Sequence, residues 1–152
     1  MHDLDEIDRK ILRILQRDGR TSMKEIAERI GKLSKVAISY RVKRLVDRGV
    51  IEGFHAKINP TSMGQDTLFI TSLKIGPKGK SEALIARKIA RLHGVQSVFQ
   101  TFGDHDIMII GRAKNATAVR DLIYEAFKIR GVIDSTSVIA HTVVSQSLAV
   151  EI

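Results

Sequence analysis

Residues 22–48 read SMKEIAERIGKLSKVAISYRVKRLVDR, and this stretch decides how the first part of the chain folds. Ser22 followed by Glu25 is a capping box that starts a helix, and Gly31 is a typical helix stop. Ser34 starts a second helix, whose apolar positions have the spacing of a core-facing side: Ile38, Val42, Leu45 and Val46. Two short helices joined by a glycine-containing turn predict a helix-turn-helix.

A third helix is expected before this pair and two short strands after it. Asp5 is placed to cap the first helix, which Gly19 ends, and its apolar residues line one side: Ile7, Ile11, Leu12 and Leu15. After the stop at Gly49, the runs 50–51 and 54–58 around Gly53 suggest a two-stranded wing. Residues 1–60 are therefore predicted to form a winged helix-turn-helix domain.

The rest of the chain alternates strand and helix patterns. After a polar linker, TSMGQD at 61–66, strands are expected at 68–75, 95–102, 107–111 and 138–144. Helices are expected over 81–92 and between Asn115 and Gly131. This βαββαβ order predicts a ferredoxin-like domain over 67–152. The fold class is α+β, with the winged helix-turn-helix at the N-terminal end.

Composition restricts the classes of function. The 152 residues carry 25 Lys and Arg against 17 Asp and Glu, a net charge of +8, which fits either a polyanionic partner or an ordinary solvated surface. The absence of cysteine excludes disulfides, thiolate metal sites and cysteine nucleophiles. The charged start, MHDLDEIDRK, has no signal-peptide pattern, and no apolar run approaches a membrane span. We therefore expect a cytoplasmic protein.

The segment from Lys32 to Arg48 carries six basic residues and a single acid, Asp47. A helix of this kind fits the major groove of DNA, with basic groups on phosphates and hydroxyl or amphipathic groups near base edges. The candidate DNA-binding residues are Lys32, Lys35, Val36, Ser39, Tyr40, Arg41, Lys43 and Arg44. The alternative is a solvated helix with ordinary charges, but its place as the second helix of the motif favours DNA.

A second cluster of polar residues is Gly103-Asp104-His105-Asp106 in the expected hairpin turn. Two acids beside a histidine suggest a metal or acid–base site, but no further ligand stands at a suitable spacing. Either the turn uses Gly and Asp for backbone reasons, or its carboxylates recognise an amino group. Ser135 and Thr136 either line a polar pocket or only begin a strand. We expect no metal and no cofactor.

Several motifs together resemble a known family. They are Leu4-Asp5-x-x-Asp8-x-x-Ile11-Leu12-x-x-Leu15, Asp18-Gly19-Arg20, Ile26-Ala27, Arg41-Val42-Lys43-Arg44-Leu45, Gly49-Val50-Ile51, Ile58-Asn59-Pro60-x-x-Met63-Gly64 and, in the second domain, Phe102-Gly103-Asp104-x-Asp106. Over nearly its whole length the chain resembles the leucine-responsive regulator/AsnC family, also called feast/famine regulators.

The resemblance implies an assembly and a ligand. Such proteins dimerise through the α/β domain, often form octamers of four dimers, and bind a small effector, usually an amino acid, between dimers. The resemblance implies an effector site at Gly103, Asp104 and Asp106, with Thr101, Ser135 and Thr136 as further candidates. Phe102 stands where threonine is frequent in the family, which changes the shape or polarity of the pocket.

Three classes of function remain in view. The first is a sequence-specific transcription regulator without enzymatic activity, which as a dimer reads two half-sites about one helical turn apart. The second is an enzyme, since sirohaem decarboxylases that act on a tetrapyrrole share this architecture, although their histidine- and arginine-rich segments are missing. The third is an architectural protein that binds DNA with little sequence discrimination and no effector response.

Overall fold

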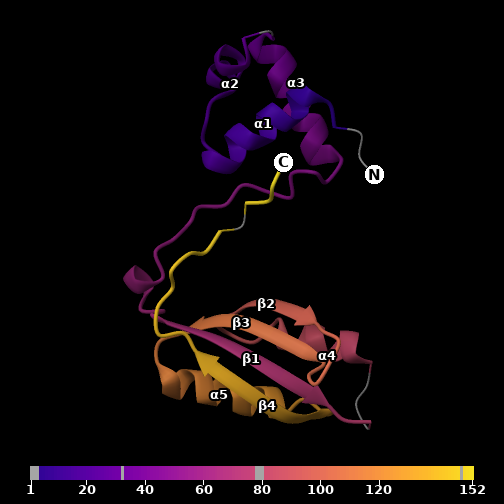
Figure 1. Cartoon of the computed structure of the whole chain (residues 1–152), viewed down its shortest axis with the longest axis vertical. Coiled ribbons are helices and arrows are strands. Elements are labelled where there is room, and N and C mark those ends of the chain that lie inside the picture. Colours follow the sequence, from indigo (N-terminus) through magenta and orange to yellow (C-terminus); the bar gives the residue numbers. More distant parts are fainter. Residues whose placement is uncertain (1–3, 32, 78–80, 148) are drawn as a thin grey trace. The chain divides into compact units, whose positions relative to one another are not determined.

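The chain forms two compact units in the computed structural model, which describes residues 4–31, 33–77, 81–147 and 149–152. Unit 1 comprises Met1–Lys57 together with Ser147–Ile152, and unit 2 comprises Ile58–Gln146. Figure 1 shows the helices of unit 1 and the sheet of unit 2. The division differs from the expected one because residues 147–152 group with the helical unit.

Within the described residues of unit 1 there are three helices: α1 (Glu6–Arg17), α2 (Met23–Ile30) and α3 (Lys35–Asp47). Each begins after a side chain that accepts a backbone N–H: Asp5 from Asp8 at 2.8 Å, Ser22 from Glu25 at 3.2 Å and Ser34 from Ala37 at 3.2 Å. The three caps expected from the sequence are therefore confirmed. Gly31 ends α2 in the left-handed conformation that glycine adopts without strain.

The three helices pack around one apolar core. Its buried residues come from every helix: Ile11, Leu12, Leu15, Ile26, Ala27, Ile38, Val42 and Leu45. Their spacing on each helix gives the apolar stripe that the sequence shows, so burial of these stripes holds the helices together. The helix-turn-helix is confirmed.

The two strands expected after α3 are not formed. Of the described residues, none between Val50 and Pro60 lies in a strand. The N–H groups of Val50 and Ile51 both donate to the carbonyl of Leu45, at 2.9 and 3.1 Å, and so close the end of α3 instead of starting a sheet ladder. Residues 52–59 are exposed. Among the described residues, the two short strands suggested at 50–51 and 54–58 are therefore not formed.

The described residues of unit 2 form a four-stranded antiparallel sheet with two α-helices. Its elements are β1 (Thr67–Ile75), α4 (Glu82–Ile89), β2 (Val95–Gln100), β3 (Ile107–Ala113), α5 (Ala116–Phe127) and β4 (Val132–Ile139). The strands lie in the order β2-β3-β1-β4. The order along the chain and the central position of β1 and β3 confirm the expected ferredoxin-like topology.

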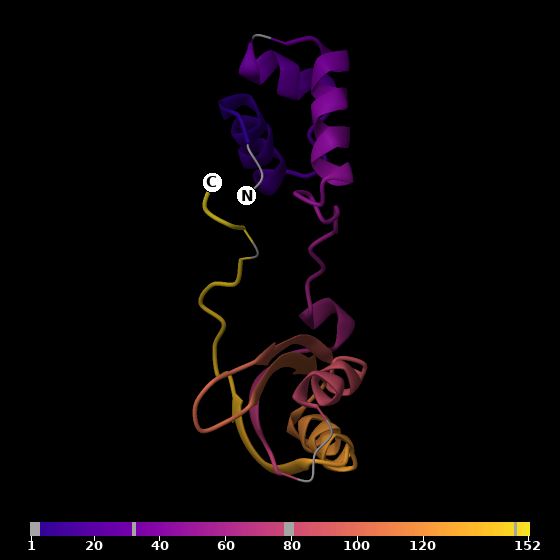
Figure 2. The same cartoon turned by 90° about the vertical axis from the view of Figure 1, so that its right-hand side faces the viewer.

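Both helices of unit 2 cover the same face of the sheet, as Figure 2 shows. Alternate residues of β1 and β3 point to them, and the core combines both sources: Phe69, Leu73, Ile107 and Ile109 with Ile85, Ile89, Val119, Leu122 and Ala126. In the part of the chain that the structure describes, no helix of unit 2 lies over the other face of the sheet. It therefore presents the intervening side chains, among them Ile70 and Met108.

Two expected boundaries in unit 2 need correction. The last strand is β4 at Val132–Ile139, where Ile75 to Phe69 of β1 pair with it, and not 138–144. β4 contains a run of Asp, Ser and Thr because its side chains are mostly exposed, so the sequence pattern did not indicate a strand there. Val143 and Val144 are apolar but lie outside any strand, and their side chains are exposed. The expected linker 61–66 contains a short 3-10 helix, η1 (Thr61–Met63), and the irregular stretch precedes it.

Candidate DNA interface and effector pocket

Helix α3 turns one side to the core of unit 1 and the other to solvent. Ile38, Val42 and Leu45 are buried on the inner side. On the outer side Val36 and Tyr40 expose 77% and 68% of their surface, and Lys35, Ser39 and Lys43 are exposed as well. Exposed apolar groups among hydroxyls and ammonium groups fit base edges and phosphates. Five of the eight predicted DNA-binding residues therefore share the exposed side of α3.

Arg41 and Arg44 are bound inside unit 1 instead. Arg41 Nη1 lies 2.6 Å from Asp5 Oδ2 and 2.7 Å from Asp8 Oδ1, and Arg44 Nη2 lies 2.8 Å from Asp8 Oδ2. Asp8 is fully buried and requires such partners, because an unpaired buried carboxylate is costly. Both guanidinium groups, which were predicted to meet DNA, are therefore held by carboxylates within unit 1. Lys32, the remaining predicted residue, lies outside the described residues.

Electrostatics at this junction favours the charged forms of both partners. The pKa of Asp5 is lowered by the hydrogen bond from the Asp8 N–H and then by the guanidinium of Arg41. The pKa of Arg41 is raised by its hydrogen bonds to Asp5 and Asp8. The network links α1 to α3 with full charges on both helices, so the position of α3 depends on α1.

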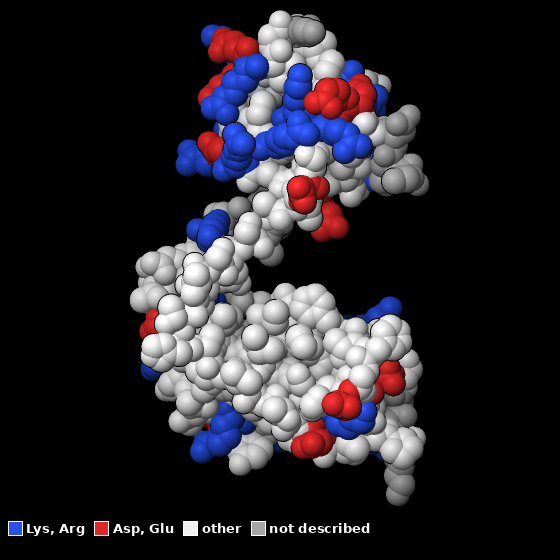
Figure 3. All heavy atoms as spheres, viewed as in Figure 1, with Lys and Arg blue, Asp and Glu red and all other residues white. Residues whose placement is uncertain are grey.

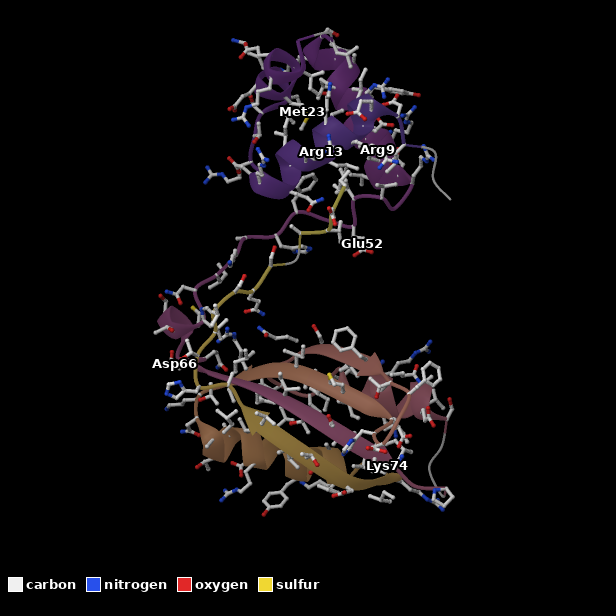
Figure 4. All side chains as sticks on the ribbon, viewed as in Figure 1. Arg9, Arg13, Met23, Glu52, Asp66 and Lys74 are labelled. Atoms are coloured by element: carbon white, nitrogen blue, oxygen red, sulfur yellow. The ribbon has the colours of Figure 1, made fainter. Side chains whose placement is uncertain are left out.

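Further basic residues lie on the solvent side of α1. Arg9, Lys10, Arg13 and Arg17 are all exposed there. Figure 3 shows Lys and Arg side chains gathered on the visible face of unit 1, and Figure 4 labels Arg9 and Arg13 on α1. The sequence interpretation missed this group, although the i, i+4 spacing of three arginines was visible. Such a surface adds to the attraction for a polyanion without reading bases.

In unit 2, the loop between β2 and β3 is fixed by its own polar groups. Asp106 Oδ2 accepts the N–H of Ile75 at 2.7 Å, and its Oδ1 lies 3.5 Å from Lys74 Nζ. The hydrogen bond from Ile75, and then the charge of Lys74, lower the pKa of Asp106. Thr101 Oγ1 donates to the carbonyl of His105 at 2.8 Å. Asp106 therefore holds the loop against β1, and Thr101 closes the loop on itself.

Beside this loop lies a hollow of about 390 Å³. It is lined by Glu82, Gln100, Thr101, Phe102, Gly103 and Asp106. Three of these, Thr101, Gly103 and Asp106, are among the predicted effector residues. Gly103 has φ of 125°, a conformation that favours glycine, so the loop shape depends on this residue. The structure thus brings half of the predicted effector set to one hollow.

Glu82 and Gln100 were not predicted. Glu82 lies in the first turn of α4 and Gln100 ends β2, so only the fold brings them together. In sequence, an acid in the first turn of a helix is ordinary, so nothing marked Glu82 as special. Both residues also line a neighbouring hollow of about 710 Å³ that reaches Ile75 and Pro77. They add a carboxylate and an amide to the polar groups available to a ligand.

The other three predicted effector residues lie elsewhere in this chain. Asp104 is exposed in the loop and does not line the hollow. Ser135 and Thr136 lie on β4, where they pair with Leu73 and Ser72 of β1. Because β1 separates β4 from β3 and its loop, Ser135 and Thr136 are kept away from the hollow.

Over residues 4–31, 33–77, 81–147 and 149–152, no three His, Asp or Glu side chains are grouped to hold a metal ion. In the same part of the chain, no helix has the length and apolar character needed to span a bilayer.

Two family models match the chain in the places where the two units lie. Residues 4–52 match a winged helix-turn-helix DNA-binding model, and residues 71–150 match the Lrp/AsnC ligand binding domain. The first match covers the three helices of unit 1. The second covers the sheet from residue 71 of β1 onward, together with the loop and the hollow.

Curated relatives match most of the chain. The HTH-type transcriptional regulator Ptr1 of Methanocaldococcus jannaschii is 38% identical over 122 residues, covering 80% of each chain. The HTH-type transcriptional regulator LrpA of Pyrococcus horikoshii is 32% identical over 145 residues, covering 95% of this chain and 99% of that protein. Both relatives are named as transcription regulators.

A solved structure agrees with these sequence matches. The feast or famine regulatory protein from M. tuberculosis, solved in complex with L-methionine, superposes with a TM-score of 0.88 at 29% identity, covering 97% of this chain and 98% of that one. Sequence, topology and both family matches lead to one conclusion. The chain belongs to the Lrp/AsnC family of helix-turn-helix transcription regulators.

Proposed function

We propose that the protein is a non-enzymatic, sequence-specific transcription regulator that reads DNA with the exposed side of α3 and responds to an amino acid. The exposed side of α3 is the observation that carries this proposal, because it leaves Val36, Ser39 and Tyr40 free to meet base edges. Lys35 and Lys43 flank them at exposed positions from which they can meet phosphates, Lys43 by leaving its exposed ion pair with Asp47. Since the partner is DNA, we also propose a cytoplasmic location.

The test of the DNA interface is salt dependence. Replacing both lysines (Lys35→Gln with Lys43→Gln) should weaken binding to every duplex by about tenfold and flatten the slope of log affinity against log salt by about two. The matched control, Lys88→Gln with Lys114→Gln, removes the same charge from exposed positions of unit 2 and should leave the slope unchanged. Equal slopes for both double variants would contradict the proposed interface.

The uncovered sheet face supports a homodimer. Ile70, Phe99, Met108 and Val138 are exposed there, and Ile70 pairs with Val138 while Met108 pairs with Phe99. The visible surface of unit 2 in Figure 3 is almost without charge across this region. A contiguous apolar surface on a soluble chain favours burial against another protein surface. We propose that a second copy covers it, because identical faces are self-complementary about a two-fold axis.

Sedimentation velocity tests this dimer. Ile70→Lys should convert the dimer to a monomer, because it places two charges in one buried interface. Leu84→Lys, at a similarly exposed apolar position on α4, should leave the assembly unchanged. The same experiment also reveals whether dimers assemble further into octamers. A dimer retained by Ile70→Lys would contradict the proposed face.

We propose the hollow beside the 101–106 loop as the effector site. Its Glu82 carboxylate has no ion-pair partner among the described residues, so it is available to the ammonium group of an amino acid. The related M. tuberculosis protein bound to L-methionine supports a ligand of this class. Calorimetry with each of the twenty amino acids should find a ligand, and Glu82→Gln should weaken its binding at least tenfold. Glu28→Gln on α2 is the control and should leave the affinity unchanged.

A further inference from the structure

Residues far apart in the sequence meet on the outer surface of α1. The backbone N–H of Val150 donates to Gln16 Oε1 at 2.9 Å, and Arg13 Nε donates to the carbonyl oxygen of Ile152 at 3.0 Å. The Ile152 side chain is partly buried against the core of unit 1. In Figures 1 and 2 the yellow end of the chain lies beside α1. The 147–152 segment is thus a built-in part of the helical unit.

This contact changes how the two units are connected. The chain leaves unit 1 between Lys57 and Ile58 and returns to it between Gln146 and Ser147. Unit 1 is therefore attached to unit 2 by two stretches of chain, whereas a released 147–152 segment would leave one. A second attachment removes part of the conformational freedom of unit 1, as a shorter or doubled linker does.

We infer that docking of the 147–152 segment on α1 sets how strictly the protein selects the spacing between two DNA half-sites. This inference rests on the proposed DNA-binding dimer. A dimer that binds both half-sites must hold both copies of unit 1 at one separation, and loosely attached units adapt to many separations. Doubly attached units fit one separation best, because their freedom is already restricted before DNA binds.

The contact is small enough to be tested without disturbing the fold. The Ile152 side chain supplies the apolar part of the contact with unit 1. Val150, in the same segment, exposes 71% of its surface and takes part only through its backbone N–H. Ile152→Asp should release the segment, because it places a charge against an apolar core. Val150→Asp is the matched control, since it introduces the same charge with its side chain in solvent.

The first experiment selects a preferred duplex from a random library with the unmodified protein. Affinities are then measured for a single half-site and for paired half-sites separated by zero to five additional base pairs. Ile152→Asp should reduce the penalty for wrong spacing on the order of tenfold, with single half-site affinity within about twofold of the unmodified protein. Val150→Asp should keep the original penalty. If Ile152→Asp kept the original penalty for wrong spacing, the inference would be overturned. If the unmodified protein bound no half-site, the proposed function would be overturned instead.

The second experiment does not depend on DNA. Because the chain contains no cysteine, the double variant Gln16→Cys, Val150→Cys has only two thiols. A short bismaleimide should join them into a product of monomer size on a denaturing gel, and the joined protein should show an equal or larger spacing penalty. A dimer-sized product would assign the segment to the partner copy and overturn the inference, and so would the absence of any cross-link.

Discussion

Helix α3 carries two pairs of basic residues whose surroundings differ. Lys35 and Lys43 are exposed on its outer side, whereas the guanidinium groups of Arg41 and Arg44 are bound to carboxylates of the same unit. In sequence all four look alike, as members of one cationic run. The difference arises on α1, where Asp8 is buried and faces the arginines. The partner on a neighbouring helix, and not the charge itself, decides which basic side chain is held inside unit 1.

Arginine suits the inner position for a physical reason. Its planar guanidinium offers several N–H donors, so Arg41 reaches Asp5 and Asp8 together with one end group. The two carboxylate oxygens of Asp8 are in turn shared between Arg41 and Arg44. Lysine provides a flexible point charge that stays hydrated, which suits phosphate contacts at the surface. The two pairs therefore differ in chemistry as well as in place.

Removal of the buried acid gives the largest expected effect. Asp8→Asn leaves Arg44 without its carboxylate partner and should lower the free energy of unfolding of unit 1 by about 3 kcal/mol. Hydrogen exchange measured by mass spectrometry on peptides from α1 and α3 should show the loss. Peptides of unit 2 serve as the internal reference.

A second variant separates burial from charge. Asp47→Asn removes an exposed carboxylate that lies 3.6 Å from Lys43, and should change stability by less than about 0.5 kcal/mol. If Asp8→Asn had an equally small effect, the inner pair would not hold α3 in place. The comparison between the two sides of α3 would then fail.

Replacing Arg41 by lysine should lower the stability of unit 1 by less than the loss of Asp8 does. Arg41→Lys keeps the charge but loses the shared contact to two acids, so it should cost about 1 kcal/mol in unit 1 while the salt slope of DNA binding stays the same. Lys43→Gln should do the reverse and reduce the slope by about one. Thermal unfolding and fluorescence anisotropy on the same preparations measure both quantities. Arg41→Gln, which removes the charge, should also leave the slope unchanged, and a slope reduced by about one in that variant would place Arg41 in the DNA interface.

Much of the fold follows from local patterns. Three N-cap residues, the apolar stripes of α1 and α3 and the βαββαβ order are all visible in the sequence, because caps and periodicity depend on residues within a few positions. The exposed side of α3 follows from the same periodicity. These features needed no knowledge of distant contacts.

The remaining features depend on residues that meet only in the folded chain. The pairing of Asp8 with Arg41 joins two helices, and Glu82 meets Gln100 only because β2 ends beside α4. The strand β4 is polar and gains its register from β1. Nothing near Ile152 in the sequence indicates that it packs against the core of unit 1. The spacing of residues along the chain cannot predict such contacts between distant segments.

Base reading on the outer side should respond more subtly than stability. Ser39→Ala or Tyr40→Ala should change the ranking of duplex sequences by a few-fold at individual positions, because each removes groups near base edges. The salt slope should stay the same, because neither change removes a cation. Selection of duplexes from a random library with each variant measures the ranking. Identical preferences for both variants and the unmodified protein would exclude these two residues from sequence reading.

The smallest expected effect concerns Asp5, the exposed end of the inner network. Its folded-state pKa lies below the unfolded value of about 4, so its contribution to stability is present above that pH and is lost as the pH falls through the folded value. Asp5→Ser keeps a side chain able to cap α1 but removes the charge beside Arg41. The difference in Tm between this variant and the unmodified protein should be constant from pH 8 to 5 and shrink below about pH 4. A difference that persists to pH 3 would mean that Asp5 acts through its cap alone, and that the charge reaching α3 comes only from Asp8.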